Sequence, residues 1–164
     1  MQSLQELYLD ELRDAYDAER QLTQALPKMM EAASSPELRQ AFELHLQQTE
    51  EQCRRLEQIF ERMGESPEGE PCEAMQGLIE EGQQLLEKRD QADPEVLDAA
   101  LIAAGNKVEH YEIASYGTLC TYAEMLGDDE AKRLLGQTLE EEKMADKKLT
   151  ALAERKINRR AAEG

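Results

Sequence analysis

The stretch NKVEHYEIASYGTL, residues 106–119, decides the fold, because it puts two acidic side chains on one face of a long helix. Glu109 and Glu112 are three residues apart, which is about one helical turn. Their face also carries Gly105, Tyr116 and Leu119, which are residue types typical of a core. The pattern therefore predicts a helical protein that aims carboxylates into its own interior.

Length and composition favour a single helical domain. The chain has 164 residues, and 40% of them are hydrophobic, which is enough to form a substantial core. We expect the domain to span residues 1–157 and residues 158–164 to form a disordered tail.

Charge and targeting signals exclude several classes of protein. The net charge of −17 argues against nucleic-acid binding and against an anionic membrane surface, because both need a basic face. No apolar run approaches the roughly 20 residues that span a bilayer, and the first residues do not resemble a secretory leader. The three cysteines lack metal-ligand spacing and suit reduced thiols, so we expect a cytoplasmic protein.

Helix start and stop signals predict four long helices and one shorter helix. Ser3 and Glu6 form a capping box, and Gly64 and Gly127 are stop signals. Pro27 is expected to kink the first helix without ending it. The predicted helices span residues 4–33, 36–63, 72–90, 94–126 and 129–157. Two tight hairpins joined by a long crossover, with the short helix in the crossover, predict an all-α, ferritin-like four-helix bundle.

The inward positions of the long helices contain acids as well as apolar residues. Expected inward positions on the second helix include Leu46, Thr49 and Cys53, and on the fourth Leu139. The inward acids are Glu19, Glu109, Glu112, Glu142 and Asp146. When each hairpin is reflected about its turn, these five acids fall at about the same height. We therefore predict one acidic layer near the middle of the bundle.

A bound metal is the simplest way to balance the negative charge of this layer. A single inward acid could result from chance or from a register wrong by one residue, but five acids on three helices at matched heights argue for a site. Unpaired buried carboxylates are costly, and their hard oxygen ligands suit iron or manganese, as one or two ions. His45 lies on a flanking position, where it is either a further ligand or a hydrogen-bonded histidine between helices.

Several stretches resemble a known family. LRDAYDAERQLTQALPKM, HLQQTEEQCRRLEQIF, KVEHYEIASYGTL and TLEEEKMADKKLTAL are similar to the YciE/YciF-type ferritin-like family of stress-associated bacterial proteins. The resemblance runs from Leu4 to about Ala153. It implies a ferritin-like bundle, often paired as a homodimer, that is related to rubrerythrins and other carboxylate-bridged di-iron proteins.

The chain departs from the broader di-iron pattern, in which two helices each give a Glu and the other two each give Glu-x-x-His. Glu19, Glu112 and Glu142 match its glutamates, but Ala145 follows Glu142 where a histidine is expected. The second helix has Thr49 and Gln52 in place of Glu and His. The site is therefore either mononuclear or a carboxylate-rich dinuclear centre.

Two functions remain open from the sequence. The first is a metalloprotein with oxidoreductase character toward oxygen or peroxide, with no catalytic residue assigned. Tyr16 and Tyr116 bracket the acidic layer and would be electron relays, or core residues whose hydroxyls bind carboxylates. The second is a non-enzymatic dimeric stress or interaction protein with a structural or vestigial metal site, using the crossover helix as its interface. Nothing in the sequence specifies an iron-storage shell.

Overall fold

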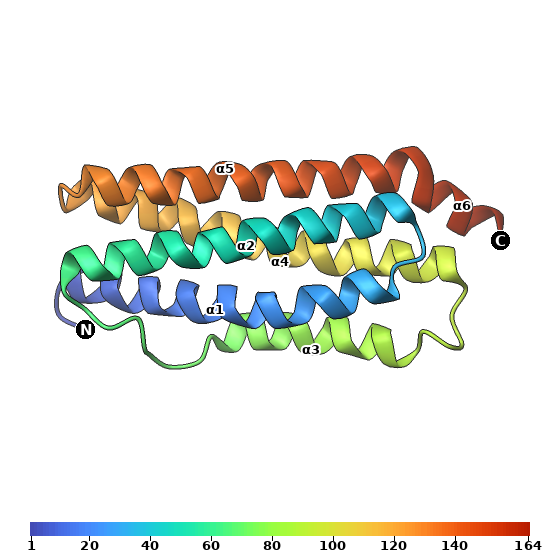
Figure 1. The fold of residues 1–164 in the computed structure, drawn as a ribbon, viewed down its shortest axis with the longest axis horizontal. Helices are drawn as coiled ribbons and strands as arrows, with labels where there is room; N and C mark the ends of the chain where they lie inside the picture. Colours follow the sequence, from blue (N-terminus) through green and yellow to red (C-terminus); the bar gives the residue numbers. More distant parts are fainter.

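The computed structural model describes residues 1–164 and contains helices as its only regular elements. Four long helices run side by side along the molecule: α1 (Leu4–Ala32), α2 (Pro36–Met63), α4 (Pro94–Met125) and α5 (Asp129–Leu152) (Figure 1). The crossover from α2 to α4 carries α3 (Glu73–Glu87), which packs along α1 and α4. The predicted all-α four-helix bundle with a helix in a long crossover is confirmed.

The helices begin and end at the residues that their capping signals predict. The Ser3 hydroxyl accepts a hydrogen bond from the Glu6 backbone N–H at 3.1 Å, which opens α1. Gly64 and Gly127, with φ of 68° and 74°, adopt the left-handed conformation that favours glycine at a helix end. α1 continues through Pro27.

The C-terminal segment differs from the expected disordered tail. A π-helical turn, Ala153–Ile157, continues α5, and α6 (Asn158–Glu163) follows it and turns away from the axis of α5 (Figure 1). Ile157 is buried within one of the two apolar clusters of the bundle. This apolar contact anchors the segment, and hydrophilic composition alone did not reveal it.

The interior of the bundle is divided into three parts. One apolar cluster includes Leu26, Phe42 and Leu101, and the other includes Leu12 and Phe60. Between them lies a buried layer of polar side chains, which we call the polar layer. It consists of Glu19, His45, Thr49, Gln52, Glu109, Glu112, Thr138 and Glu142.

No helix of this structure combines the length and the apolar character that crossing a membrane requires.

A carboxylate from α4 holds the turn between α1 and α2. Asp98 is 2% exposed and accepts hydrogen bonds from the backbone N–H groups of Ser34 and Ser35 at 2.8 Å each. The Ser34 hydroxyl donates a third, at 2.9 Å. One side chain of the second hairpin thus holds the turn of the first.

We expect Asp98→Ala to lower the free energy of unfolding by about 3 kcal/mol, because it leaves buried donors of the turn without an acceptor. Denaturant unfolding followed by circular dichroism measures the loss. Asp90→Ala is the matched control, since the Asp90 side chain is 93% exposed, and it should change stability by less than about 0.5 kcal/mol. Equal losses for the two variants would show that Asp98 does not hold the turn.

Candidate metal centre

Five potential ligands meet in the polar layer from all four long helices. Glu19 comes from α1, His45 from α2, Glu109 and Glu112 from α4, and Glu142 from α5. The four glutamates are essentially inaccessible to solvent, and His45 is 5% exposed. Each side chain follows the inward repeat of an amphipathic helix, so packing of the two apolar clusters sets its position.

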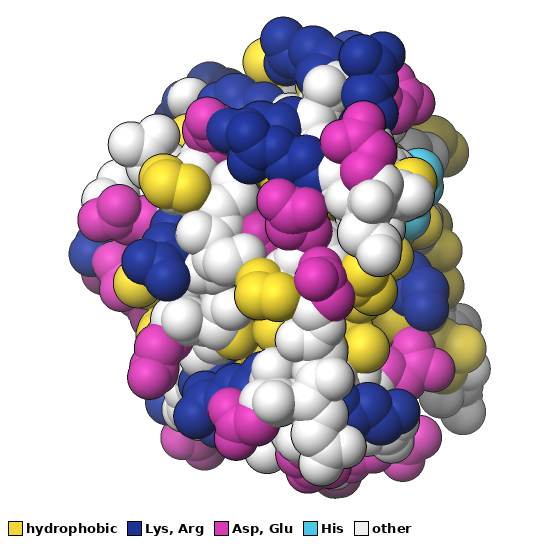
Figure 2. Space-filling view, turned by 90° about the vertical axis from the view of Figure 1, so that its right-hand side faces the viewer, with side chains coloured by type: hydrophobic (Ala, Val, Ile, Leu, Met, Phe, Trp, Pro, Cys, Tyr) yellow, Lys and Arg dark blue, Asp and Glu magenta, His cyan; other side chains and the backbone are white.

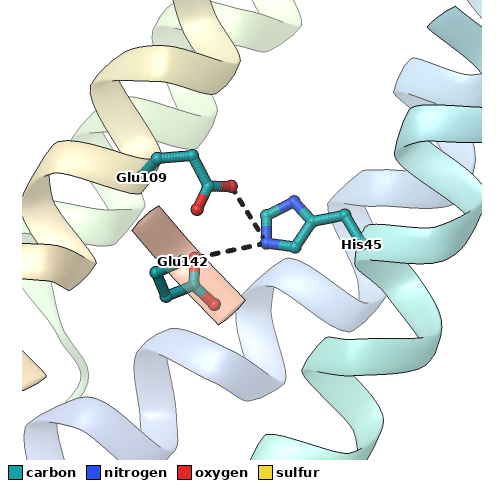
Figure 3. A group of neighbouring side chains, drawn as sticks. All are labelled: His45, Glu109 and Glu142. Atoms are coloured by element: carbon teal, nitrogen blue, oxygen red, sulfur yellow. Dashed lines mark ion pairs between the residues drawn. The ribbon is translucent and has the colours of Figure 1, made fainter. Parts of the chain in front are cut away.

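The ligand atoms lie close enough to share metal ions. His45 Nε2 is 3.0 Å from Glu109 Oε1 and 3.5 Å from Glu142 Oε2 (Figure 3). Two groups of three have all their ligand atoms within 4.8 Å of one another: His45, Glu109 and Glu142, and Glu19, Glu112 and Glu142. Glu142 belongs to both groups. The geometry is that of two adjacent ion sites with one carboxylate between them.

These ligand atoms have almost no protein donors. Glu19 Oε1 accepts a hydrogen bond from the Tyr116 hydroxyl at 2.8 Å. The other carboxylate oxygens of the four glutamates are buried without a hydrogen-bond partner. Buried polar atoms are normally paired, so this concentration at one place indicates a ligand site.

Burial changes the protonation of the layer. Burial and the nearby Glu142 raise the pKa of Glu19 to about 8. Burial likewise raises the pKa values of Glu109 and Glu112 well above the ordinary value. Without a metal, burial therefore favours the protonated form of these three carboxyl groups.

His45 and Glu142 behave differently, because they face each other. Burial opposes a charged imidazole, but Glu109 and Glu142 raise the pKa of His45 well above its usual value. Burial would also raise the pKa of Glu142, yet contacts with Glu109 and His45 lower it to about 2. In the metal-free layer, the contact between His45 and Glu142 favours an imidazolium–carboxylate pair, and metal ions must displace protons to bind.

The residues of the layer fit iron or manganese. Hard carboxylate oxygens and one imidazole nitrogen are ligands that both metals accept. Four glutamates, once deprotonated, supply four negative charges to balance the ions. The donors and their charge thus match a carboxylate-rich dinuclear centre.

The second helix supplies its ligand one turn earlier than the broader di-iron pattern. Thr49 is buried, but its hydroxyl donates to the backbone carbonyl of His45 at 2.8 Å. Gln52 donates to Glu141 Oε1 at 3.2 Å. His45, expected on a flanking position, instead points into the layer. It is the imidazole that α2 contributes.

The prediction for Asp146 is wrong. Its carboxylate lies outside the layer and accepts from Asn106 Nδ2 at 2.7 Å, and His110 Nε2 is 3.1 Å away. The inward repeat of α5 runs through Thr138, Glu142 and Leu149, so the position four residues after Glu142 turns toward the surface of α4. On the His45 side of the layer, the carboxylate beside Glu142 is Glu109 and not Asp146.

The two tyrosines, Tyr16 and Tyr116, lie in different surroundings. Tyr116 lies in the layer and holds Glu19 through its hydroxyl. Tyr16 points outward, and its hydroxyl donates to Glu57 at 2.8 Å. Only Tyr116 is placed to orient a ligand.

Two further polar residues of the layer are Gln52, which the sequence placed at the histidine position of the di-iron pattern, and Thr138, which no sequence pattern singled out. Both belong to a group that joins α2 to α5: Arg55 Nη2 donates to Glu141 at 2.9 Å and its Nη1 donates to Thr138 at 3.1 Å. We call Gln52, Arg55, Thr138 and Glu141 the α2–α5 clamp. The opposite charges of Arg55 and Glu141, at matching heights on α2 and α5, are the sequence feature that could have predicted this group.

The metal-free protein should lose stability as pH rises from 4.5 to about 8. The pKa of Glu19 is raised in the folded state, so folding binds a proton that is lost through this range. Thermal unfolding of the chelator-treated protein at several pH values measures the slope. Glu19→Gln, which stays neutral, should flatten the slope, and an unchanged slope in this variant would contradict the assignment.

Comparison with known proteins places the chain in a family. Protein YciF of Escherichia coli (strain K12) is 48% identical over 162 residues, which cover 98% of this chain and 96% of that protein. The crystal structure of the E. coli stress protein YciF superposes with a TM-score of 0.91, covering 96% of this chain and 99% of that one. YcfI of Rhodopseudomonas palustris, 47% identical, gives a TM-score of 0.86, with 92% and 94% of the two chains covered.

A more distant protein from Xanthomonas campestris pv. campestris, 21% identical with a TM-score of 0.74, shares the fold over 93% of this chain and 92% of that one. Residues 3–162 match the family described as Domain of unknown function (DUF892). With this match and the near-full-length identity to YciF, the chain belongs to the DUF892 family and is a homologue of the stress protein YciF.

Proposed function

We propose that this chain is a ferritin-like metalloprotein that binds two iron or manganese ions in the polar layer and reacts with oxygen or peroxide. One observation carries the proposal: five buried ligand groups from four helices converge with their oxygens unpaired. The stress-protein description of its E. coli relative supports a role in a stress response. The free cysteines Cys53, Cys72 and Cys120 suit a cytoplasmic setting.

The side chains of the polar layer would have different roles at this centre. One ion would be held by His45 and Glu109, the other by Glu19 and Glu112, and Glu142 would contact both. Bound iron or manganese supplies electron-transfer chemistry toward a small oxidant. Tyr116 fixes one oxygen of Glu19 and so limits its rotation. The apolar clusters on either side exclude water and keep the ligands in place.

Glu142→Gln should weaken Fe(II) binding about 100-fold or more, because it removes the carboxylate common to both ion sites. Anaerobic Fe(II) titration with elemental analysis measures the stoichiometry. The wild type should bind two ions per chain.

Glu140→Gln on the same helix is the matched control, since the Glu140 side chain is 70% exposed and pairs only with Lys143. It should bind iron like the wild type. A wild type that takes up no iron or manganese, or a Glu142→Gln protein that binds as tightly as the control, would refute the metal centre.

The second candidate function is a non-enzymatic stress protein with a structural metal. It is favoured by the second helix, where Thr49 and Gln52 bind other protein groups and only His45 remains as a ligand. In that case metal should raise the melting temperature while oxygen and peroxide consumption stay at the background rate. Peroxide turnover that rises in proportion to metal content would decide for the redox function.

We also propose a homodimer, with the outer face of α3 as its interface. α3 packs on α1 and α4 through one side only, which leaves its other face available. Sedimentation velocity of the full chain tests the assembly.

A further inference from the structure

A narrow crevice lies between α2 and α5, and His45 is one of the residues that line it. Its other walls include Phe42, Leu44 and Gln48 of α2 and Met144, Ala145 and Leu149 of α5. The volume is about 20 Å³. His45 is also the most exposed of the five ligand groups. The polar layer therefore meets the outside at one of its ligands.

The crevice opens into a wider hollow toward the C-terminal end of the bundle. The hollow has a volume of about 510 Å³ and shares Ala41, Leu44 and Lys148 with the crevice. Arg155 and Lys156 line its outer part, at the end of the molecule where Lys and Arg side chains gather over the last turns of the chain (Figure 2). The wide hollow and the narrow crevice lined by His45 are therefore adjacent.

Two other sides of the layer are covered. One turn beyond Thr49, the α2–α5 clamp joins the two helices through charged hydrogen bonds. On the opposite side of the bundle, α3 covers α1 and α4. The cavity beside α3, of about 190 Å³, is lined by residues such as Leu22 and Val108 and by none of the five ligand groups.

The dimensions and charge of the crevice select what can pass. A volume of about 20 Å³ holds roughly one water-sized molecule, since a cavity needs about 10–15 Å³ to hold a water. The Lys148 ammonium in the wall opposes divalent cations but not neutral molecules. Dioxygen and hydrogen peroxide are both small and uncharged, so they can pass, whereas bulkier hydroperoxides are too large.

We propose that this crevice is the route by which dioxygen or hydrogen peroxide reaches the metal centre, and that Ala145 keeps it open. The inference rests on the proposed function for the identity of the molecule, but the opening itself is a property of the protein without metal. Ala145 acts as a specificity-determining residue because a larger side chain at this position would fill the space in front of His45.

The two histidines of the chain allow a direct test without metal. Imidazole signals of His45 and His110 are followed by NMR in the full-length, chelator-treated protein. Dissolved oxygen, a small paramagnet, should enhance relaxation of both histidines. A bulky nitroxide should affect only His110, whose side chain is 69% exposed.

Ala145→Leu should reduce the oxygen effect on His45 by about fivefold or more, because a close-packed interior leaves no path around the added carbons. Met144→Ala, which widens the mouth, should increase the effect. Ala103→Leu is the matched control on the exposed surface of α4 and should leave His45 unchanged.

The iron-loaded protein provides the second measurement. Hydrogen peroxide should be consumed at least about tenfold faster than tert-butyl hydroperoxide, and Met144→Ala should narrow this ratio, since pocket size sets which molecules enter. An oxygen effect on His45 that is absent in the wild type, or unaltered in Ala145→Leu, overturns the route. If the oxygen effect is as expected but no iron binds, the proposed function fails while the crevice stands.

Discussion

The arrangement of this bundle depends on the burial of four glutamates in one layer between two apolar clusters. Removing carboxylates from water is unfavourable, and like charges at short distance make it more so. In the metal-free protein, burial raises the pKa values of Glu19, Glu109 and Glu112, which favours their protonated forms, and Glu142 lies against His45. The same constraint makes the layer receptive to cations, because multivalent ions remove both the proton requirement and the repulsion.

The ligand set of the layer also depends on α2, which has no metal ligand at Thr49 or Gln52. With Thr49 bound to the backbone and Gln52 directed to the clamp, His45 supplies a ligand one turn away, and Glu109 of α4 faces it. The result has the same four carboxylates as the Glu-x-x-His arrangement but one imidazole in place of two. The layer therefore keeps the full carboxylate charge of that arrangement and lacks one neutral nitrogen ligand.

The amphipathic repeat predicted the inward residues of α1 and α4, and on α2 and α5 it misplaced individual positions at and next to the polar layer. On α1 and α4, residues such as Leu12, Glu19, Glu112 and Leu119 all lie in the interior as expected. On α2 and α5, apolar flanking residues were chosen where polar ones actually face inward. Leu46, Cys53 and Leu139 were expected inside, whereas His45, Gln52 and Thr138 occupy the buried positions.

This error has a physical cause. Hydrophobic periodicity assumes that inward means apolar, and the assumption fails at a layer built from polar groups. Glu142 was placed correctly, because the predicted and observed inward positions coincide there. Asp146, four residues later, was wrongly expected to face the interior as well. Whether adjacent carboxylates share a metal depends on distances between helices, which are set by packing across the bundle and not by any local pattern.

The two seams between helices that are not neighbours in sequence explain why the site opens where it does. α1–α2 and α4–α5 are joined by short turns, whereas α1–α4 and α2–α5 meet only through side chains. α3 covers the first of these seams. The second is held by Arg55 and Glu141 on one side of the layer and by small or flexible residues, Ala145 and Met144, on the other. This seam has charged hydrogen bonds on one side of the layer and a narrow crevice on the other, and His45, the ligand that α2 provides, lines that crevice.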